Sequence, residues 1–388
     1  MPVRRRIMRA SALFLFFALG LGVMAPGCIP AIGIPPSAMV KATPALLPLP
    51  APTGGTTRTL APPHTLPVAE THGAARMSDG VELPYVQWRP TLRPVEGVVV
   101  ALHGFNDYRN AFAVTGPLLA ASGQAVYAYD QRGFGLNQHP GQTGGQWGGQ
   151  WGGQWAGVGR MTADLAQMTE LVRAQYPGKP VTLLGESMGG AVVLSALALP
   201  IPPAADRAVL VAPAVWGRTT MPFYQRAALW LGAHTVPWMS LSGRGLGRWA
   251  SDHLDMLRRL GRDPLVVKET RIESIWGLVN LMDAALEVGP PAAVPSLILY
   301  GRHDQIVPAQ PLCRLLDRDS AEAPNQPRVA LYPEGWHMLL RDLNGPVALR
   351  DVMAWLRDTK APLPSGSEAP GGWPDTLCGA KRIAAPAS

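Results

Sequence analysis

The stretch Val181-Thr182-Leu183-Leu184-Gly185-Glu186-Ser187-Met188-Gly189 decides the fold that this chain is expected to adopt. Its first four residues form a β-branched and leucine run typical of a buried strand, and the apolar residues 190–197 that follow predict a buried helix. A Gly-x-Ser-x-Gly pattern between a strand and a helix is typical of a nucleophile elbow, whose strained turn lifts the serine hydroxyl clear of the sheet. We therefore predict that Ser187 is a nucleophile. The alternative is a glycine-rich turn in which this serine only caps the helix.

Further apolar runs flank this stretch and show no polar alternation. Such runs predict strands buried on both faces of a parallel sheet. They lie at residues 98–102, 125–129, 208–211 and 297–300, whereas residues 81–88 alternate like an antiparallel edge strand. Helical patterns occur at residues 158–175, 188–199, 309–317 and 346–357. The sequence therefore predicts an α/β fold with a mostly parallel sheet, helices on both faces, and ligands at the carboxyl ends of the strands.

An activated serine needs a base within hydrogen-bond reach and an acid that orients this base. The sequence provides both in loops that follow predicted strands. Asp304 comes after the strand at residues 297–300, and His337 comes after an apolar run at residues 329–332. The chain order Ser187, Asp304, His337 is the order expected on a sheet of this kind.

Other side chains near these strand ends are weaker candidates. His303 adjoins Asp304, and because adjacent residues usually point apart, we expect it to support the loop. Asp130 follows a predicted strand ahead of the serine and is expected to bond to the backbone or to Arg132. Glu186 is predicted to be a hydrogen-bond partner beside the nucleophile and not an acid catalyst.

Acyl transfer also needs hydrogen-bond donors aimed at the developing oxyanion. The residue after the nucleophile supplies one backbone N–H group, that of Met188. The second should come from the loop after the strand at residues 98–102, which reads His103-Gly104-Phe105. We predict the N–H group of Phe105; the alternative for His103-Gly104 is a plain tight turn.

Together these motifs resemble the monoacylglycerol lipase/lysophospholipase branch of the α/β-hydrolase superfamily, which is often grouped with serine aminopeptidase-like hydrolases. The resemblance covers the expected domain at residues 71–360. It is carried by His103-Gly104, Asp130-x-Arg132-Gly133-x-Gly135, Gly185-Glu186-Ser187-Met188-Gly189-Gly190, Gly301-x-x-Asp304 and His337. It implies a serine esterase that acts on a lipid-like monoester, such as a monoacylglycerol or a lysophospholipid, without metal or cofactor. Phe105-Asn106-Asp107-Tyr108 departs from the family, because some members have a small residue and an acidic-histidine sequence there.

Three alternatives remain open for the function. A general short-chain carboxylesterase or a serine peptidase would use the same serine, histidine and aspartate. A lipid-binding lipoprotein without turnover is the alternative from another class, and the complete set of three residues argues against it.

Residues 215–293 show no buried-strand pattern, and an insertion at this point resembles the family's cap over the active site. Helices are predicted within it at about residues 221–232, 251–260 and 270–287. Most of its large apolar side chains should serve the packing of the cap itself. The candidates for contacts with an acyl chain are Trp216, Trp276 and Met282. Because ligand pockets are mostly apolar with few polar groups, this cap favours an acyl substrate over a sugar or a peptide.

The N-terminal residues 1–27 read as a signal peptide, with a basic segment followed by the uncharged residues 10–25. That run falls short of the ~20 apolar residues that a spanning helix needs. The sequence Ala25-Pro26-Gly27-Cys28 resembles a bacterial lipoprotein box, although alanine and proline replace the usual leucine and small residue. We therefore expect a cell-envelope protein anchored peripherally to a membrane by lipid on Cys28. The alternative is ordinary signal cleavage, which would leave a periplasmic or secreted protein.

Composition bounds the remaining segments. The proline-rich residues 28–70 predict a disordered linker, and residues 361–388 predict a disordered tail. The net charge of +7 owes much to the arginines of the signal segment, so it does not support a nucleic-acid partner. If Cys28 carries lipid, Cys313 and Cys378 remain as an even pair in an oxidising compartment, and their spacing leaves open whether they bond.

Residues 144–155 contain three tandem copies of Gly-Gly-Gln-Trp. This period is far too short for a solenoid repeat, and the glycine content predicts a surface loop. The three tryptophans, Trp147, Trp151 and Trp155, are candidates for contact with a membrane interface or a sugar. The alternative, which we favour, is a tolerated loop insertion.

Overall fold

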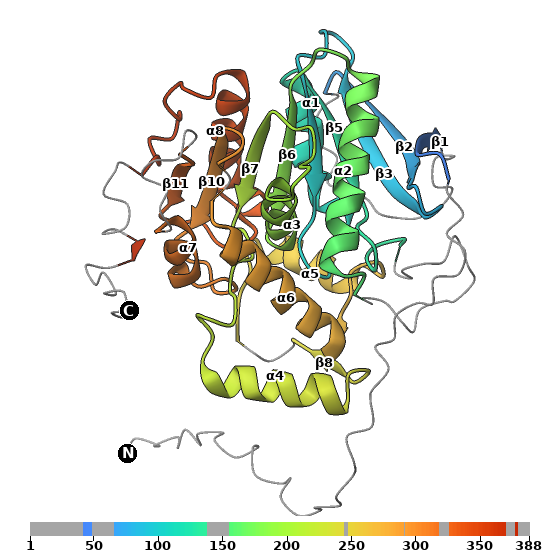
Figure 1. Cartoon of the computed structure of the whole chain (residues 1–388). Coiled ribbons are helices and arrows are strands. Elements are labelled where there is room, and N and C mark those ends of the chain that lie inside the picture. The colour runs from blue at the N-terminus through green and yellow to red at the C-terminus, as the bar shows by residue number, and fades with distance from the viewer. Residues whose placement is uncertain are drawn as a thin grey trace, which may run out of the picture. The chain divides into compact units, whose positions relative to one another are not determined.

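A nine-stranded, mostly parallel sheet forms the centre of the fold, as the sequence predicts (Figure 1). The computed structural model describes residues 42–48, 66–137, 155–243, 247–290, 292–317, 326–369 and 377–378. The strand order is β1-β2-β3-β5-β4-β6-β7-β10-β11. The bounds are β1 (Ala45–Pro48), β2 (Val68–Arg76), β3 (Glu82–Pro90), β4 (Gly97–Leu102), β5 (Gln124–Tyr129), β6 (Val181–Glu186), β7 (Arg207–Val211), β10 (Ser296–Gly301) and β11 (Arg328–Tyr332). The pairs from β5 to β11 are parallel, and β1, β2 and β3 join antiparallel to them.

The N-terminal side of the sheet corrects two predictions. β3 is antiparallel but does not lie at the edge, because β2 and then β1 continue the sheet beyond it. β1 lies inside the expected disordered linker at residues 28–70, and β2 also begins there. β1 pairs with β2 from Ala45 opposite Arg76 to Pro48 opposite Gly73. Proline is tolerated on an edge strand. The proline-rich composition of this stretch therefore gave no indication that it contains a short strand.

Helices cover both faces of the sheet and enclose two hydrophobic cores. On one face pack α2 (Val158–Gln175), α3 (Met188–Leu197) and α7 (Ala309–Leu316). On the other pack the 3-10 helix η1 (Arg109–Phe112), α1 (Thr115–Ala121) and α8 (Gly345–Arg357). In β4, Val98 and Val100 face the first core while Val99 and Ala101 face the second. Burial on both faces explains why this strand reads as an unbroken apolar run.

The cap lies between β7 and β10, where the sequence predicts it, and in Figure 1 it covers the lower end of the sheet. Its helices are α4 (Phe223–Thr235), α5 (Leu254–Arg262) and α6 (Ile272–Val288), and its hairpin pairs β8 (Ser240–Ser242) with β9 (Glu269–Arg271). Buried residues of α6 join the first of these two cores, which is the main core of the domain, whereas α4 has no buried residue. The cap is therefore attached to the sheet chiefly through α6.

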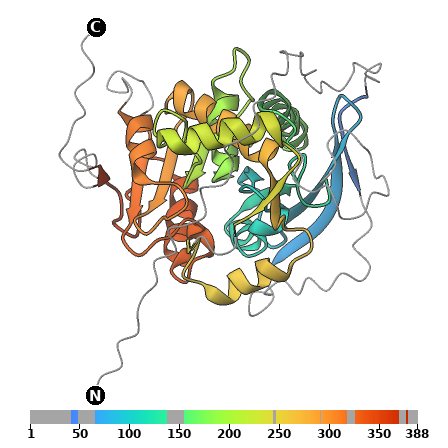
Figure 2. The ribbon, with the colours of Figure 1, turned by 90° about the horizontal axis from the view of Figure 1, so that it is seen from below.

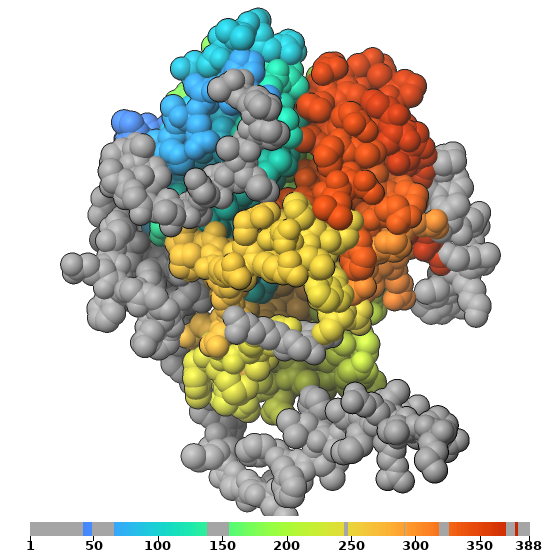
Figure 3. All heavy atoms as spheres, turned by 180° about the vertical axis from the view of Figure 1, so that it is seen from behind, coloured from blue at the N-terminus to red at the C-terminus, as the bar shows by residue number. Residues whose placement is uncertain are grey.

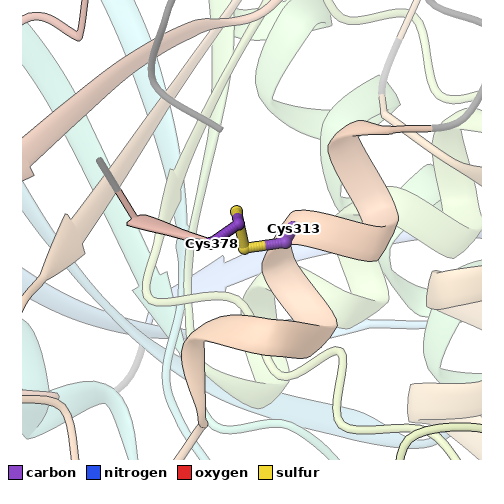
Figure 4. Close-up of a disulfide and its surroundings, with 2 residues drawn as sticks. All are labelled: Cys313 and Cys378. Atoms are coloured by element: carbon purple, nitrogen blue, oxygen red, sulfur yellow. A yellow bond between two sulfur atoms is a disulfide. The ribbon is translucent and has the colours of Figure 1, made fainter. Parts of the chain in front are cut away.

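The C-terminal segment corrects the expectation of a disordered tail at residues 361–388. Part of it follows β11: Leu331 N–H donates to Ser367 O over 2.9 Å, and Ala369 N–H donates to Val329 O over 2.8 Å. Farther on, Cys378 forms a disulfide with Cys313 of α7 (Figure 4). An edge strand offers unpaired backbone groups, and these provide the partners that the composition of the tail does not reveal.

Several predictions concern residues outside the described ranges: the signal peptide at 1–27, the lipid site Cys28, and the repeat tryptophans Trp147 and Trp151. Within those ranges, no helix combines the length and the apolar character needed to cross a bilayer.

Replacement of both Cys313 and Cys378 by serine should lower the free energy of unfolding by about 2–4 kcal/mol, because the disulfide closes a long loop in the unfolded chain. The two cysteines are 65 residues apart in sequence. Urea unfolding with and without reductant measures the change. Reduction should destabilise the wild type equally and leave the double variant unchanged. Equal stability of both proteins in oxidising buffer would contradict the expectation.

Candidate active site

Ser187 sits in a strained turn between β6 and α3. Its φ of 52° and ψ of −113° lie outside the regions that non-glycine residues usually adopt, which costs about 1–3 kcal/mol. The surrounding backbone holds this turn: Ser187 N–H donates to Val211 O over 2.9 Å, and Ser187 O accepts from Ala214 N–H over 2.9 Å. A Cβ atom at Gly189 would lie 2.2 Å from Leu102 O. The glycine is therefore required by the close approach of two backbone segments.

The structure brings Ser187, His337 and Asp304 together, although they are far apart in sequence. His337 Nε2 lies 2.9 Å from Ser187 Oγ, and His337 Nδ1 lies 2.7 Å from Asp304 Oδ2. The other oxygen of Asp304 accepts from the N–H groups of Ile306 (2.8 Å) and Val307 (2.9 Å). Because this carboxylate needs a donor, we assign the proton of the neutral imidazole to Nδ1. Nε2 is then free to accept the proton of the serine hydroxyl.

The electrostatic surroundings raise the pKa of His337 above its ordinary value of 6.5. Burial is the largest single influence and lowers this pKa, but the charge and the hydrogen bond of Asp304, together with its other surroundings, outweigh it. The negative charge of Glu186 adds to the rise, and the positive charge of Arg341 opposes it. The site therefore stabilises an imidazolium, which is the form that a general base adopts after taking a proton.

A buried ion network underlies the nucleophile. Arg341 donates to Glu186 over 3.0 Å and to Asp107 over 2.7 Å, and all three side chains are more than nine-tenths buried. Glu186 is thus a hydrogen-bond partner, as the sequence suggests. Sequence analysis missed Arg341 and the role of Asp107. The only local signal was their position, close after His337 and Phe105 respectively.

The loop that carries His337 is also bonded to the cap. Asp342 accepts from Ser251 Oγ over 2.6 Å and from Trp336 N–H over 2.7 Å. Burial raises the pKa of Asp342 to about 6, although both of these bonds act to lower it. Met338 N–H donates to Ala250 O over 2.8 Å. The position of the base therefore depends on the cap as well as on the sheet.

Two backbone donors are free beside Ser187. Within the described ranges, no acceptor is bonded to the N–H group of Phe105 or of Met188. A Cβ atom at Gly104 would lie 3.4 Å from Ser187 Cβ, so the loop that precedes Phe105 runs directly past the nucleophile. The arrangement suits the two-donor oxyanion site that the sequence predicts.

His103 fixes the conformation of this loop. Its Nε2 accepts from Gln131 N–H over 3.0 Å, which leaves Nδ1 protonated and donating to Gly104 O over 2.8 Å. Burial lowers the pKa of His103 and keeps the ring neutral. The side chain amide of Gln131 donates in return to His103 O over 2.8 Å. His103 is therefore a structural residue of the loop, and both of its ring nitrogens are in use.

Asp130 is structural, as expected, and of the two predicted partners, backbone or Arg132, it bonds to the backbone. Asp130 accepts from the N–H groups of Arg109 (2.9 Å) and Leu136 (2.8 Å) and pairs with the Arg109 guanidinium. Arg132 bonds to Asp164 instead, over 2.5 Å. The acceptor positions of the buried Asp130 are thus taken by nearer donors.

His303 supports its loop, as the sequence suggests. Its N–H group donates to Gly335 O over 2.9 Å, and its ring packs against Trp336 at 5.4 Å between centroids. The imidazole therefore contributes to packing beside Asp304 and not to the contact with Ser187.

The three predicted acyl contacts have packing partners elsewhere. The ring of Trp276 lies under the Arg218 guanidinium at 4.1 Å and against His234 at 5.5 Å. Met282 is buried in the main core, and Trp216 packs against the same core. Their contact with a substrate remains a prediction. No group of three or more His, Cys, Asp or Glu side chains in the described part of the chain could hold a metal ion.

The last residue of the tandem repeat, Trp155, lies next to the loop after β4, which the sequence did not predict. The Trp155 ring lies 6.5 Å from the Phe105 ring, which in turn lies 5.6 Å from Phe134. On its other side Trp155 packs against α6 at Gly277, where a Cβ atom would lie 2.2 Å from its indole. The repeat signalled a loop, but no pattern in it indicated where the loop would pack.

Known proteins share this fold and this arrangement of elements. A monoacylglycerol lipase of Mycolicibacterium smegmatis is 25% identical over 281 residues, which are 71% of this chain and 93% of that protein. The solved monoacylglycerol lipase of Paleococcus ferrophilus is 23% identical with a TM-score of 0.56, over 71% of this chain and 98% of that chain. A monoglyceride lipase variant from Saccharomyces cerevisiae gives a TM-score of 0.58 at 20% identity, over 72% and 92%. The fold and the site define a monoglyceride-lipase-like α/β-hydrolase, in the class of carboxylic-ester hydrolases.

A family model assigns the chain to a protein family within this class. The model described as Serine aminopeptidase, S33 matches residues 93–344, which is more than half of the 388 residues. The chain belongs to this family. The matched region includes Ser187, Asp304 and His337 and the whole cap between β7 and β10.

Gly277→Ala should displace Trp155 and destabilise the domain by about 1–3 kcal/mol, the usual cost of an overpacked core. It should also lower kcat/KM for esters, because Trp155 packs on Phe105. Gly261→Ala in α5 is the matched control: its Cβ atom would meet nothing within 4 Å. The free energy of unfolding of this control should rise by about 0.5–1 kcal/mol, because alanine has a higher helix propensity than glycine. Its activity should stay unchanged. Urea unfolding and ester kinetics on both variants test this packing, and equal behaviour of the two would refute it.

Proposed function

We propose that this chain is a serine hydrolase that cleaves a lipid-like carboxylic monoester, a monoacylglycerol or a lysophospholipid, with Ser187, His337 and Asp304 as its triad. The observation that carries the proposal is the continuous contact from Ser187 Oγ to His337 Nε2 (2.9 Å) and from His337 Nδ1 to Asp304 (2.7 Å). Phe105 and Met188 would supply the oxyanion donors.

The reaction would proceed in two half-reactions. Ser187 Oγ attacks the ester carbonyl while His337 Nε2 takes the hydroxyl proton, and the tetrahedral oxyanion lies against the N–H groups of Phe105 and Met188. Collapse breaks the ester bond, and His337 returns the proton to the leaving alcohol. Water, deprotonated by His337, then attacks the acyl-enzyme and releases the carboxylic acid and free Ser187. Asp304 stays ionised and stabilises the imidazolium in both halves.

Two observations support a lipid-like substrate. The proteins of M. smegmatis and of P. ferrophilus that the chain resembles are named as monoacylglycerol lipases. The cap also exposes large apolar side chains, among them Phe223 at 80% and Trp238 at 62% of their surface. Exposed apolar patches of this kind mark sites of interaction with membranes or other proteins.

The place of action that we propose is the cell envelope, with the chain exported and held at a membrane through lipid on Cys28. The disulfide between Cys313 and Cys378 supports export, because disulfides persist mainly in oxidising compartments.

A serine peptidase is the second candidate, because the matching family model carries the description Serine aminopeptidase, S33. Turnover of nitrophenyl esters of increasing chain length, beside an aminopeptidase substrate, separates the two functions. Lipid ester hydrolysis predicts a preference for long acyl chains and negligible peptide turnover. The opposite preference would establish the peptidase.

Ser187→Ala should lower kcat for esters by roughly 10⁴–10⁶ and abolish labelling by a fluorophosphonate probe, since triad members act as a unit. Ser195→Ala is the matched control: Ser195 is a buried serine of α3 whose hydroxyl has no hydrogen-bond partner within the described ranges. This control should keep both activity and labelling. Substantial turnover by Ser187→Ala, or loss of labelling in both variants, would overturn the mechanism.

Glu186→Gln should shift the acid limb of kcat/KM to lower pH. His337 acts as a base only when neutral, so activity is lost as the pH falls through its pKa, which lies above 6.5 in the wild type. The negative charge of Glu186 contributes to that rise, and its removal lowers the pKa. Glu82→Gln, which removes a surface partner of Arg76, should leave the limb in place. The pH–rate profiles of the wild type, Glu186→Gln and Glu82→Gln measure this shift. An acid limb at the same pH in Glu186→Gln as in the wild type would contradict the effect assigned to Glu186.

A further inference from the structure

A cavity lies beside the cap helix α5, and the proposed catalytic residues do not line it. It has a volume of about 660 Å³ and is formed by residues 110–118, by α5 with its flanks at residues 253–264, and by residues 340–349. In Figure 2, α5 (gold) lies across from the teal segment of η1 and α1 and the red segment of η3 (Leu339–Arg341) and α8. Ser187, Phe105 and His337 are not among its lining residues. The cavity therefore does not include the proposed nucleophile, base or oxyanion donor of the loop after β4, although Arg341 and Asp342 line it.

The walls of this cavity are largely apolar. Side chains of the cap face side chains of the two core segments, among them Met256, Leu260, Leu118, Leu340 and Leu349. Figure 3 shows the molecule from behind, where gold atoms of the cap lie beside the teal and the red parts. The volume falls in the ~300–1,000 Å³ range of small-molecule pockets, which are mostly apolar with a few polar groups.

The acids of the lining already have donors. Asp263 accepts from Tyr108 Oη over 2.7 Å and from Leu265 N–H over 2.9 Å. Asp342 accepts from Ser251 and from the backbone of Trp336. Each of these two carboxylates is held in the wall by uncharged donors.

The arginines of α5 differ from one another in this respect. Arg259 and Arg262 line the cavity, are exposed, and have no carboxylate at ion-pair distance within the described ranges. Their neighbour Arg258 does not line the cavity and is paired with Asp255 at 2.6 Å. The cavity thus combines an apolar interior with two arginines at one side that have no ion-pair partner among the described residues. Guanidinium groups of this kind can bind the carboxylate of an amphiphile.

We propose that this cavity binds a single-chain fatty-acid anion, with its alkyl chain against the apolar walls and its carboxylate at Arg259 and Arg262. Burial of its methylene groups stabilises such a complex, and the guanidinium groups select the charged head. The proposed ester hydrolysis would release an anion of this class, but the binding itself does not depend on that reaction.

Dodecanoate binding to the Ser187→Ala variant, measured by calorimetry below the micelle concentration, tests the site. Replacing Arg259 and Arg262 together by glutamine should weaken binding about tenfold or more, as expected for the loss of charge-assisted bonds. Arg258→Gln on the same helix should bind as the parent does. Val114→Trp, at an exposed position of the lining, should fill the cavity and abolish binding. Dodecanol, which lacks the charge, should bind at least tenfold more weakly than dodecanoate.

Three results would overturn the proposal. The first is dodecanoate binding that the double arginine variant and Val114→Trp leave unchanged, because the ligand then sits elsewhere. The second is absence of binding, or equal affinity for dodecanol. The third is an arginine effect confined to anionic phosphatidylglycerol vesicles, which would indicate a membrane surface contact. Fluorophosphonate labelling of the wild-type chain reports separately on the proposed catalysis, so failure of one proposal does not imply failure of the other.

Discussion

The close approach of backbone segments around Ser187 is the constraint on which the rest of the site depends. α3 can start directly under β4 only because Gly189 leaves space for Leu102 O. The same proximity puts the loop after β4, which carries Phe105, beside the serine. The strain at Ser187 is borne by hydrogen bonds to β7 and its following loop. A bulkier residue at any of these close approaches would displace Ser187 together with the backbone N–H groups of Phe105 and Met188.

Much of the fold could be predicted from the sequence, because strands buried on both faces are apolar throughout and the reactive residues follow their carboxyl ends. The parts that were missed have partners that local sequence does not reveal. β1 and residues 367–369 are short segments completed by an existing edge, and composition described both as disordered. Trp155 lay in a recognisable repeat, yet only the space left at Gly277 determines where its ring packs.

Charge pairing shows the same division. The sequence predicts that Glu186 and Asp130 are structural, because each adjoins a strand end in a buried region. It does not predict their partners, since an arginine can reach any acid within several ångströms. Arg109 pairs with Asp130. Arg341, in the segment that follows His337, bridges Glu186 and Asp107. The Arg341 bridge thus links three segments in one buried group. They are the turn at Ser187, the loop after β4 that carries Asp107, and the segment that follows His337.

The C-terminal segment also bears on how the molecule behaves beside other copies of itself. Residues 367–369 complete the edge of β11, and the disulfide of Cys378 ties the chain that follows them to α7. An uncovered strand edge offers backbone groups that can pair with another chain, which is a known route to aggregation. The segment therefore protects the sheet edge against association as well as adding to the stability of the fold.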